Sequence, residues 1–545
     1  SVCRLSHLKK LYRIRGIKNN RLFLYEIPIK LVTILRNHDT LNKDLIFGRN
    51  EDFMISISEY PVPVLTGDFS HKTIHVKVPG SKSITNRALL LAMLSDGKSH
   101  LTGAQFSEDS SHFLQCLSDL SFDVASRPET GEVSVHGLSG RLPVKKASLY
   151  VGSAGTAARF LSAVLGVSEG EFFLDASEQM KKRPMAPLLS ALQSVGCDIS
   201  FAEKEGFFPF TLHARGFQNT DLTIDIDKSS QFLSALLIAA PLAKEDVKIK
   251  VAGTHGMAYI EMTCRMMEQF GVLTEHPSPD TFLIKAGQTY RAQDYAIEPD
   301  VSAACYFYAL AALSGCSVIV DGVPEHSLQG DTEFLNILEK MGCRVTRTNE
   351  GICITGPAAC AESAGVKSAD AGSKTASHAS GSASHASGSV SHASGSVSHV
   401  SGSVSHVSGS VSHASGRLHG LTVDMSSCSD QAITLAAIAP FADSPVTITG
   451  IGHIRGQESD RLSAITENLT AMGIRCDERA DSITIYPGVP KPAHIKTHDD
   501  HRLAMGFAVT GLFAEGIVIE NPSCCKKTFA EFFECLEEAV ENLQK

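Results

Sequence analysis

The feature that most constrains the fold of this chain is a unit that recurs six times, at intervals of roughly 70 residues. Each copy opens with a short cluster of small polar residues, which is followed by an apolar run of helical length. A period this long makes every copy a small subdomain, so we expect the copies to group around shared cores. Once a low-complexity insertion at 363–416 is set aside, the copies begin near Lys82, Ser153, Ser229, Asp300, Cys428 and Asp500.

A second helical pattern recurs within the units. It is amphipathic, and it usually closes with a glycine just before a β-rich stretch. A helix with a glycine C-cap that leads into a strand explains this pattern, and the sequence therefore predicts an α/β fold. The segments are 187–199 with Gly196, 259–273 with Gly271, 331–345 with Gly342 and 461–476 with Gly473.

Composition places the chain among ordinary globular proteins, with 545 residues, 43% hydrophobic residues and 20% charged residues. The formal net charge of -10, without a basic stripe that carries interleaved aromatic residues, argues against a nucleic-acid-binding protein. No apolar run reaches the ~18 residues that a membrane span needs. The 14 cysteines include no C-x-x-C pair, and most lie in apolar segments, so we expect reduced core thiols rather than disulfides or a zinc site.

Two segments differ from the repeats in composition. Residues 1–50 hold eleven Lys or Arg against three acidic residues, and they suit a transit segment, a basic leader or a linker from an upstream domain. Residues 363–416 contain six Ser/His/Gly-rich heptads, which cannot bury enough apolar surface to offset their ordering entropy. We expect a disordered insertion there, whose six histidines at most bind a metal loosely.

Cations stand at several of the expected helix starts, where they oppose the helix dipole. Placing them there costs stability unless an anion is bound, so the sequence predicts a site for multiply charged anions. Asp300 and Glu458 are candidates for proton transfer, although Asp300 also suits a simple N-cap. The cations are Lys82, Arg87, Arg183, Arg502 and Lys527, the last of which is expected at the start of the final helix.

At these positions the chain resembles the 3-phosphoshikimate 1-carboxyvinyltransferase (EPSP synthase) family, from roughly residue 53 to 540. Each motif is weak alone, but all occur in the family's order, which chance similarity does not explain. The motifs are P-G-S-K-S-I-T-N-R at 79–87, G-S-A-G-T-A-A-R at 152–159, K-K-R-P at 181–184, S-S-Q-F at 229–232, Q-G-D at 329–331, Q-E-S-D-R at 457–461, D-H-R at 500–502 and K-T-F at 527–529.

The resemblance implies an α/β fold of two domains, each built from three βαβαββ-type repeats in an inside-out α/β barrel. The N-terminal-half domain would span 79–287, and the C-terminal-half domain would span 288–545 with the interruption at 363–416. The first strands, within 51–78 and near Phe53 to Ser58, would belong partly to the C-terminal-half domain. The implied reaction transfers the enolpyruvyl group of phosphoenolpyruvate to the 5-hydroxyl of shikimate 3-phosphate in aromatic amino-acid biosynthesis, with no metal or organic cofactor.

The resemblance also implies roles for individual residues. Asp300 would take the proton from the attacking hydroxyl, and Glu458 would protonate the methylene carbon, a role shared in the family with Lys82 and Lys527. Shikimate 3-phosphate would be held by Lys82, Ser83, Arg87, Ser229, Ser230, Gln231, Tyr259, Asp300, His453 and Gln457. Phosphoenolpyruvate would be held by Lys82, Gly155, Arg183, Gln231, Arg461, Arg502 and Lys527.

Five positions depart from the family's usual pattern. Losing one charge-assisted hydrogen bond costs ~1.5–3 kcal/mol unless water or Arg455 substitutes for it. We therefore expect weaker binding of shikimate 3-phosphate and no change of fold. The positions are Gln457 (usually lysine), Gly456 (usually apolar), His453 (usually asparagine), Gly256 (usually serine) and Phe160 (usually proline).

Two alternatives stand beside this interpretation. The related transferase that acts on UDP-N-acetylglucosamine carries a reactive cysteine in a mobile loop, whereas this chain has no cysteine between Cys116 and Cys197. A catalytically impaired homologue, kept as a structural domain of a multifunctional shikimate-pathway polypeptide, is consistent with the changes at Gln457 and Gly256. We expect small anionic substrates, no nucleic-acid or membrane partner, and a cytoplasmic location, or a plastid one if residues 1–50 are a transit segment.

Overall fold

The computed structural model describes residues 14–18, 21–24, 58–357 and 417–545. The tract predicted at 363–416 and most of the basic leader lie outside the described residues, so both predictions stay untested. Within the leader, strands β1 (Ile14–Lys18) and β2 (Arg21–Leu24) pair in antiparallel. Among the described residues, no helix combines the length and the apolar character that crossing a membrane requires.

One topology is shared by six of the sheets that the described residues form. In each sheet two strands pair in parallel, and the remaining strands add in antiparallel. In four of these sheets a helix connects the two parallel strands, whereas in the other two the parallel partner comes from a distant part of the chain. A second helix follows the second strand of each unit. This is a βαβαββ unit, and it confirms the predicted α/β fold of repeated subdomains.

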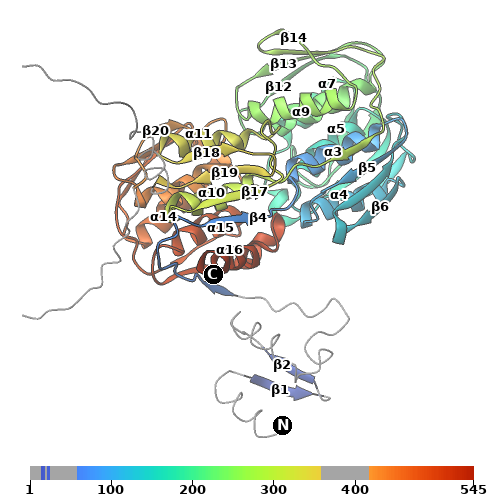
Figure 1. The fold of residues 1–545 in the computed structure, drawn as a ribbon. Coiled ribbons are helices and arrows are strands. Elements are labelled where there is room, and N and C mark those ends of the chain that lie inside the picture. Colours follow the sequence, from blue (N-terminus) through green and yellow to red (C-terminus); the bar gives the residue numbers. More distant parts are fainter. Residues whose placement is uncertain (1–13, 19–20, 25–57, 358–416) are drawn as a thin grey trace, which may run out of the picture.

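The N-terminal half holds three of these units, coloured blue to green in Figure 1. Its elements are α3 (Lys82–Leu94), β5 (Lys98–Thr102), α4 (Glu108–Asp119), β6 (Asp123–Arg127), η2 (Pro128–Thr130), β7 (Glu132–His136), β8 (Lys146–Tyr150), α5 (Gly155–Gly166), β9 (Glu169–Asp175), α6 (Glu178–Lys181), α7 (Ala186–Ser194), β10 (Asp198–Phe201), β11 (Phe210–Arg215), β12 (Asp221–Asp225), α8 (Gln231–Ala239), η3 (Ala240–Leu242), β13 (Val247–Ala252), α9 (Met257–Gln269), β14 (Glu275–Ser278), β15 (Thr281–Ile284) and β16 (Asp294–Ala296).

The C-terminal half repeats the arrangement, coloured yellow to red, and adds two strands from the start of the described core. Its elements are β3 (Glu59–Pro61), β4 (Thr73–Val76), α10 (Val301–Ser314), β17 (Ser317–Asp321), η4 (Gly330–Thr332), α11 (Glu333–Lys340), β18 (Arg344–Arg347), β19 (Gly351–Thr355), β20 (Thr422–Asp424), η6 (Ser429–Gln431), α13 (Ala432–Ile438), η7 (Ala439–Phe441), β21 (Val446–Thr449), η8 (Gly452–Gly456), α14 (Arg461–Ala471), β22 (Cys476–Glu478), β23 (Ile483–Ile485), β24 (Ala493–Ile495), α15 (His501–Gly511), β25 (Ile517–Glu520), η9 (Pro522–Lys527) and α16 (Phe532–Gln544).

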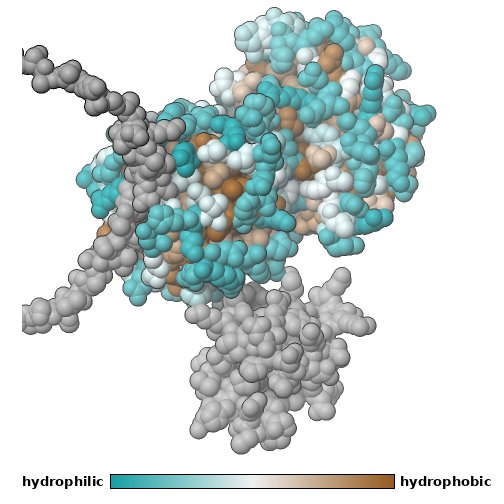
Figure 2. Space-filling model, in the orientation of Figure 1, coloured by the Kyte–Doolittle hydropathy of each residue, from teal (hydrophilic) through white to brown (hydrophobic). Residues whose placement is uncertain are grey.

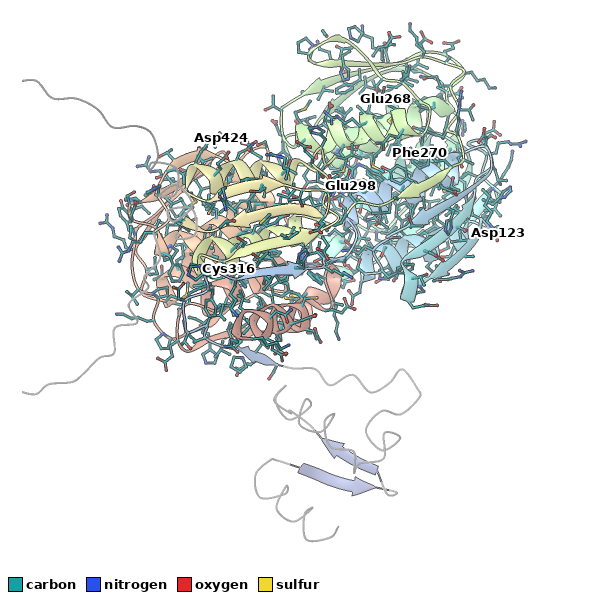
Figure 3. The ribbon with its side chains drawn as sticks, in the orientation of Figure 1. Asp123, Glu268, Phe270, Glu298, Cys316 and Asp424 are labelled. Atoms are coloured by element: carbon teal, nitrogen blue, oxygen red, sulfur yellow. The ribbon has the colours of Figure 1, made fainter. Side chains whose placement is uncertain are left out.

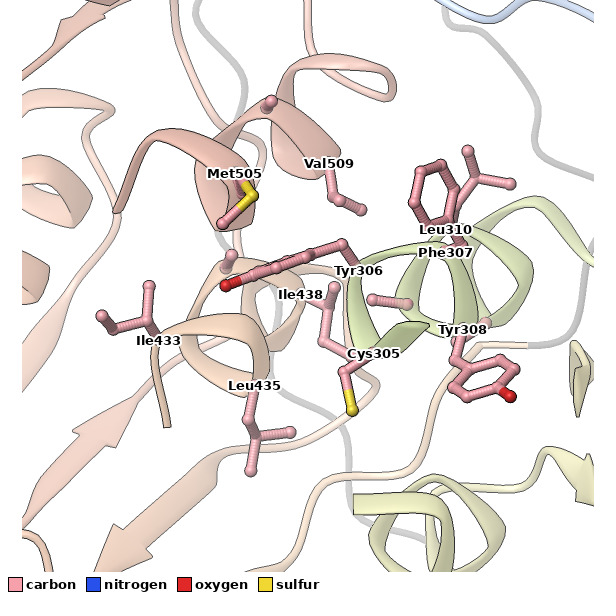
Figure 4. Close-up of a cluster of buried hydrophobic side chains, with 14 of the residues drawn as sticks. Cys305, Tyr306, Phe307, Tyr308, Leu310, Ile433, Leu435, Ile438, Met505 and Val509 are labelled. Carbon is pink, nitrogen blue, oxygen red and sulfur yellow. The ribbon is translucent and has the colours of Figure 1, made fainter. Parts of the chain in front are cut away.

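The first helix of each unit lies at the centre of its half. Every residue of α5, α13 and α15 is buried, as expected for helices that are apolar on all sides. In the C-terminal half, Tyr306 of α10 lies among side chains of α13 and α15, including Ile438 and Met505 (Figure 4). Helices therefore occupy the inside of each half and sheets the outside, as the inside-out barrel predicts.

The two halves exchange strands. Strand β16 pairs in parallel with β5 of the N-terminal half, and β4 pairs in parallel with β17 of the C-terminal half. Because of the first pairing, the core of the N-terminal half extends to Ile297, beyond the boundary predicted at 287. Strand β3 pairs with β25 of the C-terminal half. Most of the strand predicted near Phe53 to Ser58 falls on residues outside the described ones.

Two chain segments cross side by side between the halves, where Figure 3 labels Glu298. The Ser81 N–H donates to the Glu298 carbonyl at 2.8 Å, and the Asp300 N–H donates to the Pro79 carbonyl at 2.8 Å. Gly80 is required here, because a Cβ would lie 1.8 Å from the Gly103 carbonyl oxygen. The crossing places the starts of α3 and α10 next to each other.

Two further sequence predictions are confirmed. The glycines expected to close the amphipathic helices have positive φ, between 74° at Gly473 and 102° at Gly196, which suits a C-cap. The cysteines of the described residues are free, and most are buried. They are therefore reduced core thiols.

Candidate active site

A cavity of about 500 Å³ lies between the two halves and is lined by both. Hydrophilic residues cover much of the visible face of the two halves (Figure 2). The cavity brings together residues that the sequence scatters over more than three hundred positions. The predicted site residues that line it are Lys82, Ser83, Arg87, Gly155, Arg183, Ser229, Ser230, Gln231, Tyr259, His453, Gln457, Glu458, Arg461 and Arg502.

Three central helices of the N-terminal half begin at this cavity without a capping side chain. The N-cap residues of α3, α5 and α8 make no capping hydrogen bond, and no acidic residue lies in their first turns. In the C-terminal half, by contrast, Asp300 and Asp500 cap α10 and α15. The first N–H of α3 donates to the Asp300 carboxylate and that of α8 donates to the Ser229 hydroxyl, while the positive dipole ends of all three helices point toward the cavity and favour anions there.

Arg87, in the second turn of α3, is 1% exposed, and no carboxylate of the described residues pairs with it. Its guanidinium donates to Thr263 Oγ1 at 2.8 Å and to the Ser83 carbonyl at 3.0 Å. It also lies over the ring of Phe160, 5.3 Å from the centroid. Burial lowers the pKa of Arg87 to about 10, so this residue presents an uncompensated positive charge at neutral pH.

Three side chains converge on Gly155, at the first turn of α5. A Cβ at this position would lie 2.9 Å from Nη1 of Arg159, 3.1 Å from Nη1 of Arg183 and 3.4 Å from Oε1 of Gln231. Burial, followed by Arg183, lowers the pKa of Arg159. Arg159 is absent from the sequence prediction, although it ends the motif at 152–159 and follows Gly155 by one helical turn.

Asp430 is a second residue that the sequence prediction omits, and it lies at the centre of the charge network. Its carboxylate accepts from Arg461 and Arg502 at 2.9 Å each, and from the Tyr259 hydroxyl at 3.0 Å. Burial raises the pKa of Asp430, but Arg502 and Arg461 outweigh it and hold the pKa below its ordinary value. Since Tyr259 belongs to the N-terminal half, Asp430 joins the two halves across the cavity. The sequence signal that could have identified Asp430 is its place near the start of the fifth repeat, because Asp300 stands near the start of the fourth.

Asp300 does not line the main cavity. Its Oδ2 accepts the N–H of Lys82 at 3.0 Å, and its Oδ1 accepts the N–H of Ala303 at 3.0 Å. It faces a smaller adjoining cavity that Arg502 also lines. In this structure Asp300 caps α10 and ties it to the start of α3.

Glu458 lies between two basic side chains, with His501 Nδ1 at 3.1 Å and Lys527 Nζ at 3.2 Å. Burial opposes its ionisation, yet His501 and Lys527 hold the pKa of Glu458 well below the ordinary value. The prediction that Lys527 starts the last helix is wrong, because Lys527 ends η9 and α16 begins only at Phe532. Thr528 leaves the helical region, with φ -139°, and separates the two elements.

Glu458, Asp500 and His501 offer ligand atoms that lie within 4.8 Å of one another. Cations already neutralise both carboxylates, since Arg461 Nε contacts Asp500 at 2.7 Å and Lys527 contacts Glu458. A metal ion would have to displace these partners, so the donor set fits a metal poorly.

Neither Gln457 nor Arg455 replaces the charge of the lysine that is usual at position 457. The Gln457 side-chain oxygen accepts from Arg461. Arg455 pairs instead with Asp460 at 3.1 Å and with Glu478 at 2.5 Å, and it does not line the cavity. Arg455, the candidate substitute for the lysine, is therefore engaged elsewhere.

Known proteins resemble this chain over most of its length. The family model described as EPSP synthase (3-phosphoshikimate 1-carboxyvinyltransferase) matches residues 71–379 and 377–536. A protein of Nostoc punctiforme named 3-phosphoshikimate 1-carboxyvinyltransferase is 39% identical over 459 residues, which covers 84% of this chain and 94% of that protein. A protein of the same name from Aeromonas salmonicida is 34% identical over 466 residues, which covers 85% of this chain and 95% of that protein. A solved EPSP synthase from Acinetobacter baumannii shares the fold, with a TM-score of 0.66 at 22% identity over 87% of this chain and 97% of its own.

Proposed function

The chain belongs to the EPSP synthase (3-phosphoshikimate 1-carboxyvinyltransferase) family, and we propose that the cavity between its halves performs the family's reaction. The protein transfers the enolpyruvyl group of phosphoenolpyruvate to the 5-hydroxyl of shikimate 3-phosphate and releases phosphate. The observation that carries the proposal is the meeting of three helix N-termini with the buried cations Arg87, Arg461 and Arg502 in one cavity. Two small, multiply charged anions require such a site.

Phosphoenolpyruvate binds at the start of α5. Gly155 leaves room there, and the Arg159 and Arg183 guanidinium groups supply the donors beside it. Arg461 and Arg502 face this subsite from the C-terminal half. The same guanidinium groups stabilise the charge that develops when phosphate departs from the tetrahedral intermediate.

Shikimate 3-phosphate binds at the starts of α3 and α8. Ser83, Ser229 and Ser230 offer hydroxyl donors, and Arg87 supplies the buried positive charge behind them. Tyr259 carries the contact across to Asp430 at 3.0 Å. The substrate thus lies against groups from both halves, which favours closure around it.

We assign to Asp430, rather than to Asp300, the role of the base that accepts the proton of the attacking hydroxyl. Asp430 lines the main cavity, whereas both oxygens of Asp300 accept backbone N–H groups. In the free protein Arg502 and Arg461 hold the pKa of Asp430 low. Anionic substrates that engage these arginines weaken that hold, so Asp430 becomes a stronger base when the substrates are bound.

Glu458 and Lys527 transfer the proton to and from the methylene carbon of phosphoenolpyruvate. Because Glu458 is ionised in the free protein, a proton that it delivers comes from Lys527, whose Nζ lies 3.2 Å away. Burial lowers the pKa of His501, so its neutral ring orients Glu458 and does not supply the proton. Return of the proton to this pair restores the resting state after elimination of phosphate.

The impaired-homologue alternative is not favoured, since curated relatives that cover most of the chain carry the enzyme's name. The test is the release of phosphate from phosphoenolpyruvate by purified protein, with and without shikimate 3-phosphate. We expect release only when both are present, together with an enolpyruvyl ether product in mass spectra. No turnover with both substrates bound would favour the impaired homologue instead.

A further inference from the structure

Two imidazole rings meet across the mouth of the cavity. His255 comes from the turn between β13 and α9 of the N-terminal half, and His453 comes from η8 of the C-terminal half. Their ring centroids lie 3.9 Å apart, and both residues line the cavity. His453 Nε2 lies 2.7 Å from Ser429 Oγ. The pair is therefore a contact between the halves that faces the substrate space.

Two positions beside the pair lack a cationic side chain. Gly256, next to His255, has φ +67°, and a Cβ there would lie 2.6 Å from Ser230 Oγ, so position 256 cannot supply a side chain without strain. The side chain that this turn presents to the cavity next to Gly256 is that of His255. On the other side, the Gln457 oxygen is directed at Arg461. Position 256 carries no side chain and Gln457 carries no charge, whereas each of the two imidazoles can bind a proton.

We propose that His255 and His453 form a two-imidazole subsite that binds the phosphate of shikimate 3-phosphate from both halves and takes up a proton as it binds. The inference rests on the proposed function and deepens it. The imidazoles supply the positive charge that a lysine at position 457 would have supplied. One proton is taken up rather than two, because two imidazolium ions at 3.9 Å would repel each other.

The charges around the pair support uptake on binding. Burial lowers the pKa of His255, and burial with His255 lowers the pKa of His453 to about 4. Asp430 raises the pKa of both rings, and Asp227 raises that of His255. Arg461 lowers the pKa of His453 further, and Lys228 is another cation that lines the cavity. Both rings are thus neutral at pH 7 until a phosphate dianion arrives and favours an imidazolium ion beside it.

The first test is isothermal titration of the protein with shikimate 3-phosphate at pH 7, in two buffers that differ in ionisation enthalpy. The difference in heat gives the number of protons taken up. We expect wild type to take up close to one proton more than the double variant His255→Gln, His453→Asn; the substrate's own phosphate titrates equally in both. Equal uptake by the two proteins would overturn the proposal.

The second test uses steady-state kinetics. The double variant should raise KM for shikimate 3-phosphate about ten-fold at pH 7, with kcat and KM for phosphoenolpyruvate within about two-fold of wild type, because the phosphate contact is the same in the ground and transition states. His276→Gln, on β14 and away from the cavity, is the matched control. Unchanged KM in the double variant would contradict the subsite. Absence of any shikimate 3-phosphate binding by wild type would overturn the proposed function as well, whereas binding with equal proton uptake overturns this inference alone.

Discussion

Acidification should weaken the folded state through His453. Burial, together with His255, lowers its pKa from the ordinary 6.5 to about 4, so the unfolded chain binds a proton at a pH where the folded chain does not. The stability that this group contributes is fully present above pH 6.5 and is lost as the pH falls toward 4. Because the ring is partly exposed and solvent screens part of this effect, we expect about 1 kcal/mol to be lost by pH 5.

Urea unfolding at pH 7.5 and pH 5 measures this loss in wild type and in His453→Asn. Asparagine does not titrate in this range, and it retains a group that can hydrogen-bond Ser429. Wild type should lose about 1 kcal/mol more than the variant between the two pH values. His276→Gln should behave as wild type does. Equal losses in wild type and His453→Asn would refute the reasoning, because the other buried groups titrate in both proteins.

Three other perturbations have expected outcomes. Phe160→Leu removes the ring beside the buried Arg87 guanidinium, so it should cost about 2 kcal/mol in urea unfolding and raise KM for shikimate 3-phosphate several-fold; the half-exposed Phe173→Leu is the control, and equal effects would exclude a role for the ring. Gly155→Ala would place a Cβ 2.9 Å from Arg159 Nη1 and 3.1 Å from Arg183 Nη1, so KM for phosphoenolpyruvate should rise at least about ten-fold while KM for shikimate 3-phosphate holds. An unchanged phosphoenolpyruvate KM would move that subsite away from α5. Deleting 363–416 behind a short linker should leave kcat nearly intact, because Pro357 and His419, which flank the tract, both approach position 342 within 4 Å; loss of folding would show that the tract contributes to the core.

The repeated helices could be predicted from the sequence because burial leaves a direct trace in it. A central helix such as α5 must be apolar on every side, and it begins where small polar residues end the preceding loop. The glycine caps are equally local, since Gly196 and Gly473 take positive φ that few other residues tolerate. Most cavity residues followed from motifs that lie at those helix starts.

What the sequence did not reveal depends on tertiary placement. The exchange of β4 and β16 between the halves leaves no periodic signal, so the boundary was placed ten residues early. Asp300 and Asp430 both lie just before a central helix in successive repeats, and only the packing shows that one meets backbone N–H groups while the other meets Arg461 and Arg502. The sequence likewise does not show that Arg455 pairs with Asp460 and Glu478 and so cannot take the place of the lysine usual at position 457.

The central claim is that Asp430 acts as the catalytic base, whereas Asp300 caps α10. Phosphate release under saturating substrates, measured side by side for wild type, Asp430→Asn and Asp300→Asn, tests it directly. We expect Asp430→Asn to lower kcat at least about a hundred-fold, as loss of a general base does, and Asp300→Asn to stay within about ten-fold of wild type. A steep loss in Asp300→Asn beside near-normal turnover in Asp430→Asn would contradict the account.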